Sequence, residues 1–211
     1  MSIIKKILGF SAGIALSFVF VFFAFAQGQE ELVLDDFEGA ISGGEAGTVD
    51  FGSGGGSLVE VKASKEVKHH GEQALEVKFE AIAGGYMWIG RGYDMTVKGA
   101  ACWLVKPEDI DFKKFNAISV NIYGADTKSQ IAVDLVDSGS EYWRYLIEDN
   151  FSGWKEIVIP FGDFFSRGDW QPDKADKNGV IDFPLKVFQF EPRPESKGTL
   201  YFDYVRLVKT E

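Results

Sequence analysis

The sequence predicts an all-β protein built as a two-sheet sandwich or a barrel. About ten short segments of the 211-residue chain alternate apolar and polar residues, which is the pattern of strands with one face in a core. Clusters of Gly, Asp, Ser and Pro separate these segments. Only residues 107–115 and 161–166 favour helical turns. Many short strands with almost no helix indicate two packed sheets.

The N-terminus has the pattern of an export signal. Lys5 and Lys6 precede residues 7–26, which carry no charge and end on Ala-Phe-Ala. A signal peptidase accepts small residues at the first and third positions before its cut. We therefore predict a signal peptide over residues 1–26 and an exported protein, either periplasmic, at the cell surface or secreted. The alternative is an uncleaved membrane anchor, because about 20 apolar residues can span a bilayer.

Residues 27–211 are predicted to form a single domain. Removing 26 of the 211 residues leaves 185, which is within the range of one all-β domain. Loss of Lys5 and Lys6 takes the net charge from −10 to −12. A chain this acidic repels nucleic acid and anionic lipid. We expect no nucleic-acid partner, and a membrane partner only if the signal segment is uncleaved. The lone Cys102 lies in an apolar stretch, which predicts a small buried hydrophobe.

The first part of this domain is predicted to hold one strand, a long loop and three further strands. A strand over residues 32–37 precedes residues 39–57, which contain eight glycines. Such a composition is typical of a flexible loop. The loop lacks both the strand-to-helix context and the Lys-Ser/Thr ending of a phosphate loop, so we expect no nucleotide site here. Strands are then expected over residues 58–63, 73–81 and 86–91.

The later part of the chain continues the period-2 pattern. In one segment Ile118, Val120 and Ile122 alternate with Ser119, Asn121 and Tyr123. An acidic segment over residues 169–182 indicates a polar loop. The predicted strands of this part cover residues 118–123, 130–136, 142–147, 154–160, 187–191 and 199–208.

Five motifs follow one another in an order that resembles the order of motifs in a known family. They are Leu-Asp-Asp-Phe-Glu-Gly at 34–39, His-Gly-Glu-Gln-Ala-Leu at 70–75, Asp-Phe-Lys-Lys-Phe-Asn at 111–116, Trp-Lys-Glu-Ile-Val-Ile-Pro-Phe at 154–161 and Gly-Thr-Leu-Tyr-Phe-Asp-Tyr-Val-Arg-Leu at 198–207. The chain resembles the jelly-roll carbohydrate-binding modules of the galactose-binding-like superfamily, above all family 11, and the related complex I intermediate-associated proteins. The resemblance implies an antiparallel jelly roll. The glycine-rich segment 39–57 departs from the compact pattern of these modules.

The resemblance also implies a structural calcium ion that joins the first strand to the last. Glu38 and Asp203 would be its carboxylate ligands, with backbone carbonyls near His70 and Glu72. Calcium takes six to eight oxygen ligands, carbonyls included, in flexible geometry. The alternative is that these acidic residues cap turns or face solvent.

Carbohydrate recognition needs flat aromatic faces and planar polar side chains. A sugar stacks its C–H face on an aromatic ring, while amides, carboxylates and guanidinium groups bind its hydroxyls. If the strands pair as in a jelly roll, we expect their polar faces to line one concave sheet. Trp103, Trp143 and Trp154 are instead predicted to lie in the core. The candidate ligand-binding residues are Tyr86, Trp88, Asn121, Tyr123, Asp134, Tyr142, Arg144 and Gln189.

The sequence gives little support for catalysis. The two histidines, His69 and His70, are adjacent and would point to opposite faces of a strand, so they indicate an exposed turn. No Ser or Cys stands in a nucleophile motif. A glycosidase needs only two carboxylates, which an acidic chain always offers, so hydrolase or lyase activity stays an open alternative. We expect a protein that is not an enzyme.

Two functions fit these observations. The first is an exported, non-catalytic carbohydrate-binding protein that recognises a glucan-like polysaccharide on the concave sheet. The second is a structural or assembly protein that uses the sandwich for contacts with a protein partner, as the complex I assembly relatives and flagellar sheath proteins do. Coplanar exposed aromatic rings on the concave sheet would favour sugar, and a smooth apolar patch would favour a protein partner.

Overall fold

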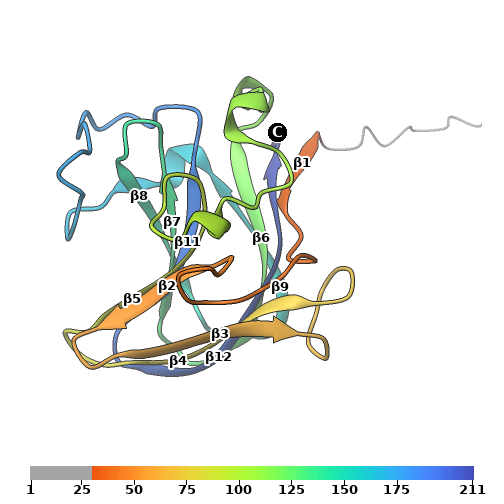
Figure 1. Ribbon diagram of the computed structural model, residues 1–211, viewed down its shortest axis with the longest axis vertical. Helices are drawn as coiled ribbons and strands as arrows, with labels where there is room; N and C mark the ends of the chain where they lie inside the picture. Colours follow the sequence, from red (N-terminus) through yellow and green to blue (C-terminus); the bar gives the residue numbers. More distant parts are fainter. Residues whose placement is uncertain (1–29) are drawn as a thin grey trace, which may run out of the picture.

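The protein is a sandwich of two packed antiparallel sheets, which confirms the predicted fold class (Figure 1). The computed structural model describes residues 30–211, and the predicted signal peptide at residues 1–26 lies outside them. Within the described residues, no helix has the length and apolar character needed to cross a membrane. Each sheet contains six strands.

The first sheet, called sheet A here, is built around the long C-terminal strand β12. Its strands follow the order β3-β4-β12-β6-β9, and β1 also pairs with β12. The first and last strands of the domain are therefore neighbours, with Leu32 opposite Leu207. The strands of sheet A are β1 (Glu31–Asp35), β3 (Leu58–Ser64), β4 (Ala74–Ala81), β6 (Ala117–Ala125), β9 (Ser152–Pro160) and β12 (Ser196–Val208).

The second sheet, called sheet B, carries the strands that matter for the functional site. Its order is β10-β8-β7-β11-β5-β2. Short 3-10 turns connect the strands: η1 (Lys98–Ala100), η2 (Pro107–Asp109), η3 (Phe112–Lys114) and η4 (Phe161–Asp163). The strands of sheet B are β2 (Asp50–Gly54), β5 (Tyr86–Gly92), β7 (Gln130–Val136), β8 (Tyr142–Glu148), β10 (Phe165–Ser166) and β11 (Val187–Pro192).

All ten predicted strands are present, with ends that differ by a few residues. The prediction of an unstructured glycine-rich loop over residues 39–57 is wrong in part, because β2 lies inside it and pairs with β5 over five residues. Two of the outward positions of β2 are glycines, so the strand shows no alternation of apolar and polar side chains. The predicted helical turn over residues 107–115 is present as η2 and η3.

The core lies between the two sheets and is rich in aromatic rings. Alternate residues of β7 and β11 point inward, among them Val133 and Phe190. The ring of Phe190 stacks on Phe202 of β12 with centroids 3.9 Å apart, which joins the two sheets at their centres. Trp103 and Trp143 are buried as predicted. The same prediction is wrong for Trp154, which is half-buried.

A buried ion pair also lies among these core residues. Arg91 of β5 donates from Nη1 to Asp35 Oδ1 at 3.0 Å and from Nε to the sulfur of Cys102 at 2.9 Å. Burial raises the pKa of Asp35 to about 6, although the positive charge of Arg91 opposes this shift. Cys102 is half-buried, so the prediction of a fully buried hydrophobe is only partly right.

Candidate functional site

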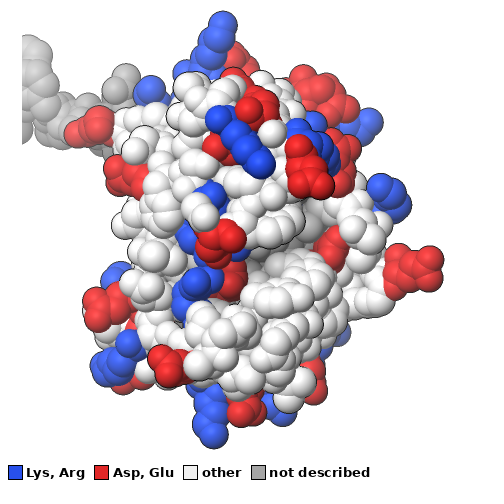
Figure 2. Space-filling model, turned by 90° about the vertical axis from the view of Figure 1, so that its left-hand side faces the viewer, with Lys and Arg blue, Asp and Glu red and all other residues white. Residues whose placement is uncertain are grey.

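The outer face of sheet B is hollowed into a cleft with a volume of about 840 Å³. Strands β2, β5, β8 and β11 supply its lining, together with residues 93–96 and 167–174. Figure 2 shows this side of the molecule. A hollow lies there between uncharged surfaces (white), and Lys or Arg atoms (blue) and Asp or Glu atoms (red) lie next to each other beside it. The inward placement of apolar residues on these strands is what leaves their polar residues on this face.

The centre of the cleft is a floor of paired charges, formed by Asp134, Arg144, Gln189 and Glu191. Asp134 of β7 lies directly opposite Arg144 of β8 and Gln189 of β11. Arg144 donates to both carboxylate oxygens of Asp134, at 2.7 and 2.8 Å, and also to Glu191. Gln189 Nε2 donates to Asp134 Oδ2 at 3.2 Å. All four side chains are buried, so this floor has a fixed geometry.

A second arginine closes the floor from the segment that follows β10. Arg167 donates to Asp134 Oδ2 at 3.1 Å and makes two bonds of 3.0 Å to Asp169. These bonds from Arg167 lower the pKa of Asp169 to about 2. For Arg144, burial opposes the charge, but the hydrogen bonds and charge of Asp134 outweigh it and raise its pKa above the ordinary value. The arginines of the floor therefore stay charged and engaged by carboxylates.

An aromatic platform formed by Tyr86 and Trp88 makes one wall of the cleft. The two ring planes are nearly parallel, with an interplanar angle of 15° and centroids 6.3 Å apart. Tyr86 is 57% exposed, and Trp88 is half-buried. The indole Nε1 of Trp88 donates to Asp50 Oδ1 at 3.0 Å, which fixes its orientation. Two parallel rings, of which Tyr86 is exposed and Trp88 half-buried, form a surface on which a sugar can stack.

The opposite wall is formed by Tyr142 and Trp170. Their rings meet edge to face with centroids 5.1 Å apart, and Trp170 is 51% exposed. The guanidinium of Arg167 lies 5.9 Å from the Tyr142 ring centroid and 5.7 Å from that of Trp170. Burial raises the pKa of Tyr142, with a further contribution from Asp134. The cleft thus places two aromatic walls around a polar floor, an arrangement suited to a ligand with both C–H faces and hydroxyl groups.

Most of the predicted ligand-binding residues come together in this cleft. Tyr86, Trp88, Tyr142 and Gln189 line it, and the buried Asp134 and Arg144 lie beneath this lining, bonded to Gln189, Glu191 and Arg167. The expectation of one common sheet is wrong for Asn121 and Tyr123. Both lie on β6, which pairs with β9 and β12 in sheet A, and not with β7. Alternation of residues tells which face of a strand is outward, but the sheet to which the strand belongs depends on long-range pairing.

The outer face of sheet A gathers a separate aromatic group around Tyr123. Its ring meets Trp154 of β9 and Tyr201 of β12 edge to face, each with centroids 5.6 Å apart. His69 contacts Trp154 from an exposed turn, as the sequence predicts for the two histidines. Asn121 is buried on the same face, and its Nδ2 has no hydrogen-bond partner. The Tyr123 ring therefore stands nearly perpendicular to both of these neighbours.

Five of the residues that shape the cleft as described above, Asp50, Arg167, Asp169, Trp170 and Glu191, are among those not predicted from the sequence. Glu191 could have been found, because it follows Gln189 by two residues on a predicted strand and so shares its face. Asp50 could not be found, because the glycines around it leave no alternating pattern that would mark a strand. Arg167, Asp169 and Trp170 belong to an irregular segment whose acidic composition indicates only a polar loop, so no periodicity marks them.

The residues predicted to hold calcium lie around the loop at residues 69–73. Asp203 Oδ2 accepts hydrogen bonds from the backbone N–H groups of His69 and His70, both at 2.9 Å. Glu38 Oε1 accepts from the backbone N–H groups of Glu72 and Gln73, at 2.8 and 3.2 Å. The two carboxylates thus tie one loop to the first and last strands.

The donor chemistry of this region suits a hard cation in one respect. Asp203 Oδ1 is buried without a hydrogen-bond partner, and burial raises the pKa of Asp203, opposed by the bonds from His70 and His69. The side chain of Glu72 is exposed and lies 3.5 Å from Lys68. In residues 30–211, no group of three or more His, Cys, Asp and Glu side chains is placed to hold a metal ion. Calcium at Glu38 and Asp203 therefore stays a prediction that would also need backbone carbonyls.

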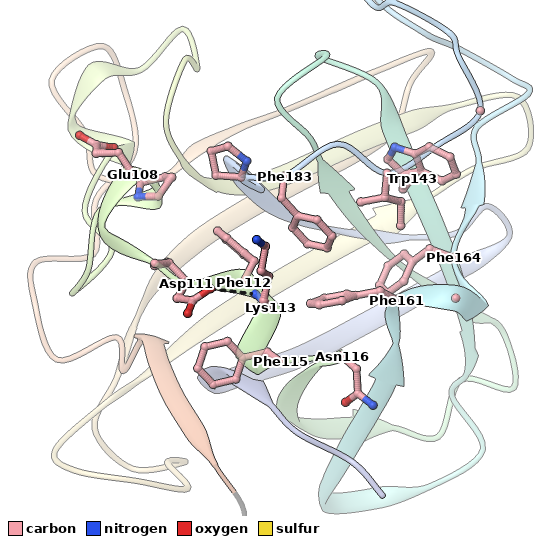
Figure 3. Close-up of a pocket in the computed structure, with 16 residues that line it drawn as sticks. Glu108, Asp111, Phe112, Lys113, Phe115, Asn116, Trp143, Phe161, Phe164 and Phe183 are labelled. Atoms are coloured by element: carbon pink, nitrogen blue, oxygen red, sulfur yellow. Dashed lines mark hydrogen bonds between the residues drawn. The ribbon is translucent and has the colours of Figure 1, made fainter.

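A second pocket opens at one end of the sandwich and has a different character. Its volume is about 860 Å³, and Figure 3 shows aromatic rings around it. Phe183 packs against Phe112 and Phe161, with ring centroids 5.0 and 5.4 Å away. The polar Asn116 at its rim is bonded to Thr210. This pocket is an open end of the apolar core, and it lacks the paired polar floor of the cleft.

Comparison with known proteins gives consistent results. A family model described as a carbohydrate binding domain of family 11 matches residues 25–210. The chain is 29% identical over 179 residues to endoglucanase H of Acetivibrio thermocellus. The matched region covers 84% of this chain but only 18% of that enzyme. The chain therefore spans less than a fifth of this curated relative.

Two solved structures share the fold. One is a family 11 carbohydrate-binding module from Clostridium thermocellum in complex with a β-1,3-1,4-mixed-linked tetrasaccharide, at 25% identity and a TM-score of 0.67, with 85% of this chain and 96% of that chain covered. The other is the family 11 module of a cellulosomal cellulase of the same organism, at 24% identity and a TM-score of 0.65, covering 86% and 95%.

Proposed function

The chain belongs to the carbohydrate-binding domains of family 11, and we propose that it binds a glucan-like polysaccharide in the cleft of sheet B. The observation that carries this proposal is the aromatic platform of Tyr86 and Trp88, whose parallel rings share the cleft with Tyr142 and Trp170 above a polar floor. A sugar ring would stack on the platform through its C–H face. A smooth apolar patch, which would favour a protein partner, is not what this face presents.

The charge of the floor favours a neutral polysaccharide. Arg144 and Arg167 are both bound to Asp134, and Asp169 takes two further bonds from Arg167. Glu191 is shared by Arg144 and Arg193. A uronate or sulfate group would have to compete with these carboxylates for guanidinium groups that are already engaged, whereas hydroxyl groups can use the remaining donor and acceptor positions.

The ligand of a similar solved structure supports a glucan in particular. The solved family 11 module that is 25% identical to this chain holds a β-1,3-1,4-mixed-linked tetrasaccharide. The part of endoglucanase H that this chain matches is a small fraction of that enzyme, so the match carries no catalytic activity with it. We therefore propose a non-catalytic binding protein. Export, which residues 1–26 predict, is part of the same proposal, since an exported protein can reach polysaccharides outside the cell.

The test is affinity electrophoresis of residues 27–211 through gels that contain β-1,3-1,4-mixed-linked glucan. The wild-type chain is expected to be retarded, and Trp88→Ala is expected to lose most of the retardation. Trp154→Ala is the matched control, because it removes a tryptophan from the outer face of sheet A and leaves the cleft intact. Equal migration of the wild type with and without glucan, at any glucan concentration used, would rule out the proposal.

A further inference from the structure

The edge strand β2 presents almost no side chains to the cleft. Phe51 packs against the core, so Asp50, Gly52 and Gly54 are the residues that face outward. In the register of the sheet, Gly52 lies opposite Trp88 and Gly54 lies opposite Tyr86. Each aromatic residue of the platform therefore has a glycine as its paired residue on the edge strand β2.

The two rings occupy the space that side chains on β2 would need. A Cβ atom built on Gly52 would lie 2.5 Å from Cη2 and from Cζ2 of Trp88. A Cβ atom built on Gly54 would lie 2.4 Å from Cζ and from Oη of Tyr86. Side chains on a sheet ordinarily stand roughly perpendicular to it. Here both rings lean sideways and lie over the backbone of the edge strand.

Asp50 holds the indole in this leaning position. Its Oδ1 accepts from Trp88 Nε1 at 3.0 Å, and its Oδ2 accepts from the backbone N–H of Val97 at 3.0 Å. Asp50 is itself buried. One outward residue of β2 therefore anchors the edge of the indole, and the next leaves room for its face.

We propose that Gly52 and Gly54 are positioning residues of the sugar-binding site, because their missing side chains leave the space in which Trp88 and Tyr86 lean over β2 with parallel ring planes and present their faces to the ligand. This inference rests on the function proposed above. A methyl group at either position raises the ring above it, so that an edge replaces a face in the cleft. Sugar stacking requires the face.

The backbone conformation of these two glycines separates a positioning role from a purely structural one. A structural role would predict that alanine lowers the stability, and the positioning role does not. Gly52 and Gly54 lie within a strand and neither has a positive φ, so alanine can adopt their conformation. Glycine weakens a strand relative to alanine. Alanine at Gly52 is therefore expected to leave the stability unchanged or slightly higher while it disturbs the ring.

A first experiment tests the ring position without any sugar. In the NMR spectrum of the free protein, each tryptophan gives one indole N–H signal, and that of Trp88 reports its bond to Asp50. Gly52→Ala is expected to shift the Trp88 signal and leave those of Trp103 and Trp143 in place. Gly162→Ala is the matched control, since nothing lies within 4 Å of the added Cβ. An unshifted Trp88 signal in Gly52→Ala would overturn the proposal.

A second experiment links the ring position to binding of mixed-linked glucan, measured by titration calorimetry. Gly52→Ala is expected to weaken binding about tenfold, and to have no further effect in a Trp88→Ala background. Equal losses in both backgrounds would contradict a role exerted through Trp88. If the wild type binds no glucan, the proposed function fails, while the sugar-free spectrum still decides whether the glycines position the rings.

Discussion

Arg144 binds both carboxylate oxygens of Asp134 at the floor of the cleft, with Nε–Oδ1 and Nη2–Oδ2 distances of 2.7 and 2.8 Å. Both side chains are almost fully buried, at 4% and 0% exposure. The strands that carry them are neighbours, and the two residues lie directly opposite each other. This pair connects the stability of sheet B to the shape of the site.

Removal of the charge of Asp134 is predicted to destabilise the protein. Asp134→Asn leaves Arg144 and Arg167 without their shared carboxylate inside the sheet, which costs about 3 kcal/mol in the free energy of unfolding. Urea denaturation measures this cost. Asp126→Asn is the control, because its ion pair with Lys128 is largely exposed to solvent and contributes little to stability. Equal effects of the two variants would show that the floor is not a buried network.

Trp170 is predicted to contribute to binding and not to stability. The side chain is 51% exposed and its ring meets Tyr142 at the edge of the cleft, so Trp170→Ala removes a wall without opening the core. Binding of mixed-linked glucan is expected to fall roughly tenfold in calorimetry, with an unchanged midpoint of urea denaturation. Unchanged affinity would place the ligand away from this wall.

Calcium is predicted to stabilise the protein through Asp203 and Glu38. Occupation of the site at a hundred times its Kd would add about 2.7 kcal/mol to the free energy of unfolding. Differential scanning calorimetry with calcium and with chelator measures the shift in Tm. Asp203→Asn is expected to abolish the shift, because Oδ1 is the buried oxygen without a partner, and Asp163→Asn, an exposed control, is expected to keep it. No calcium dependence in the wild type would refute the predicted ion.

The buried carboxyl of Asp35 predicts a pH dependence of stability. Its pKa is raised by burial from 3.8 to about 6, so the folded state favours the protonated form. Its stabilising contribution is therefore fully present below about pH 4 and is lost as the pH rises through about 6, a change on the order of 3 kcal/mol. The difference in unfolding free energy between the wild type and Asp35→Asn is expected to follow this window. A difference that stays constant from pH 4 to pH 7 would contradict the assignment.

The fold could be predicted from the sequence because its strands carry regular alternation. β4, β6, β7 and β11 are all marked by apolar residues at every second position, and the structure places those residues in the core. β2 could not be predicted, since Gly52 and Gly54 have no side chains to form a pattern. The structure gives the reason for these glycines: the rings of Trp88 and Tyr86 lie over them.

The candidate site was only partly predictable. Asp134, Arg144 and Gln189 were recognisable as outward residues of their strands. Asp134 and Arg144 meet because consecutive strands pair, whereas Gln189 reaches Asp134 through the long-range pairing of β11 with β7. Asn121 was assigned to the same surface on the expectation that the polar faces of the strands line one sheet, although the chain passes from β6 in sheet A directly to β7 in sheet B. That connection crosses from one sheet to the other, which local sequence does not record. Trp170 lies on an irregular segment, where position is decided by contacts such as those with Tyr142 and Arg167.

The five tryptophans offer the most direct test of the central claim that glucan binds in the cleft of sheet B. Trp88 and Trp170 line the cleft, Trp103 and Trp143 are buried in the core, and Trp154 lies on the outer face of sheet A. The measurement is the set of five indole N–H signals during titration with a β-1,3-1,4-mixed-linked tetrasaccharide. We expect the signals of Trp88 and Trp170 to move in a saturable way while that of Trp154 stays in place. Movement of Trp154 with Trp88 and Trp170 unchanged would contradict it.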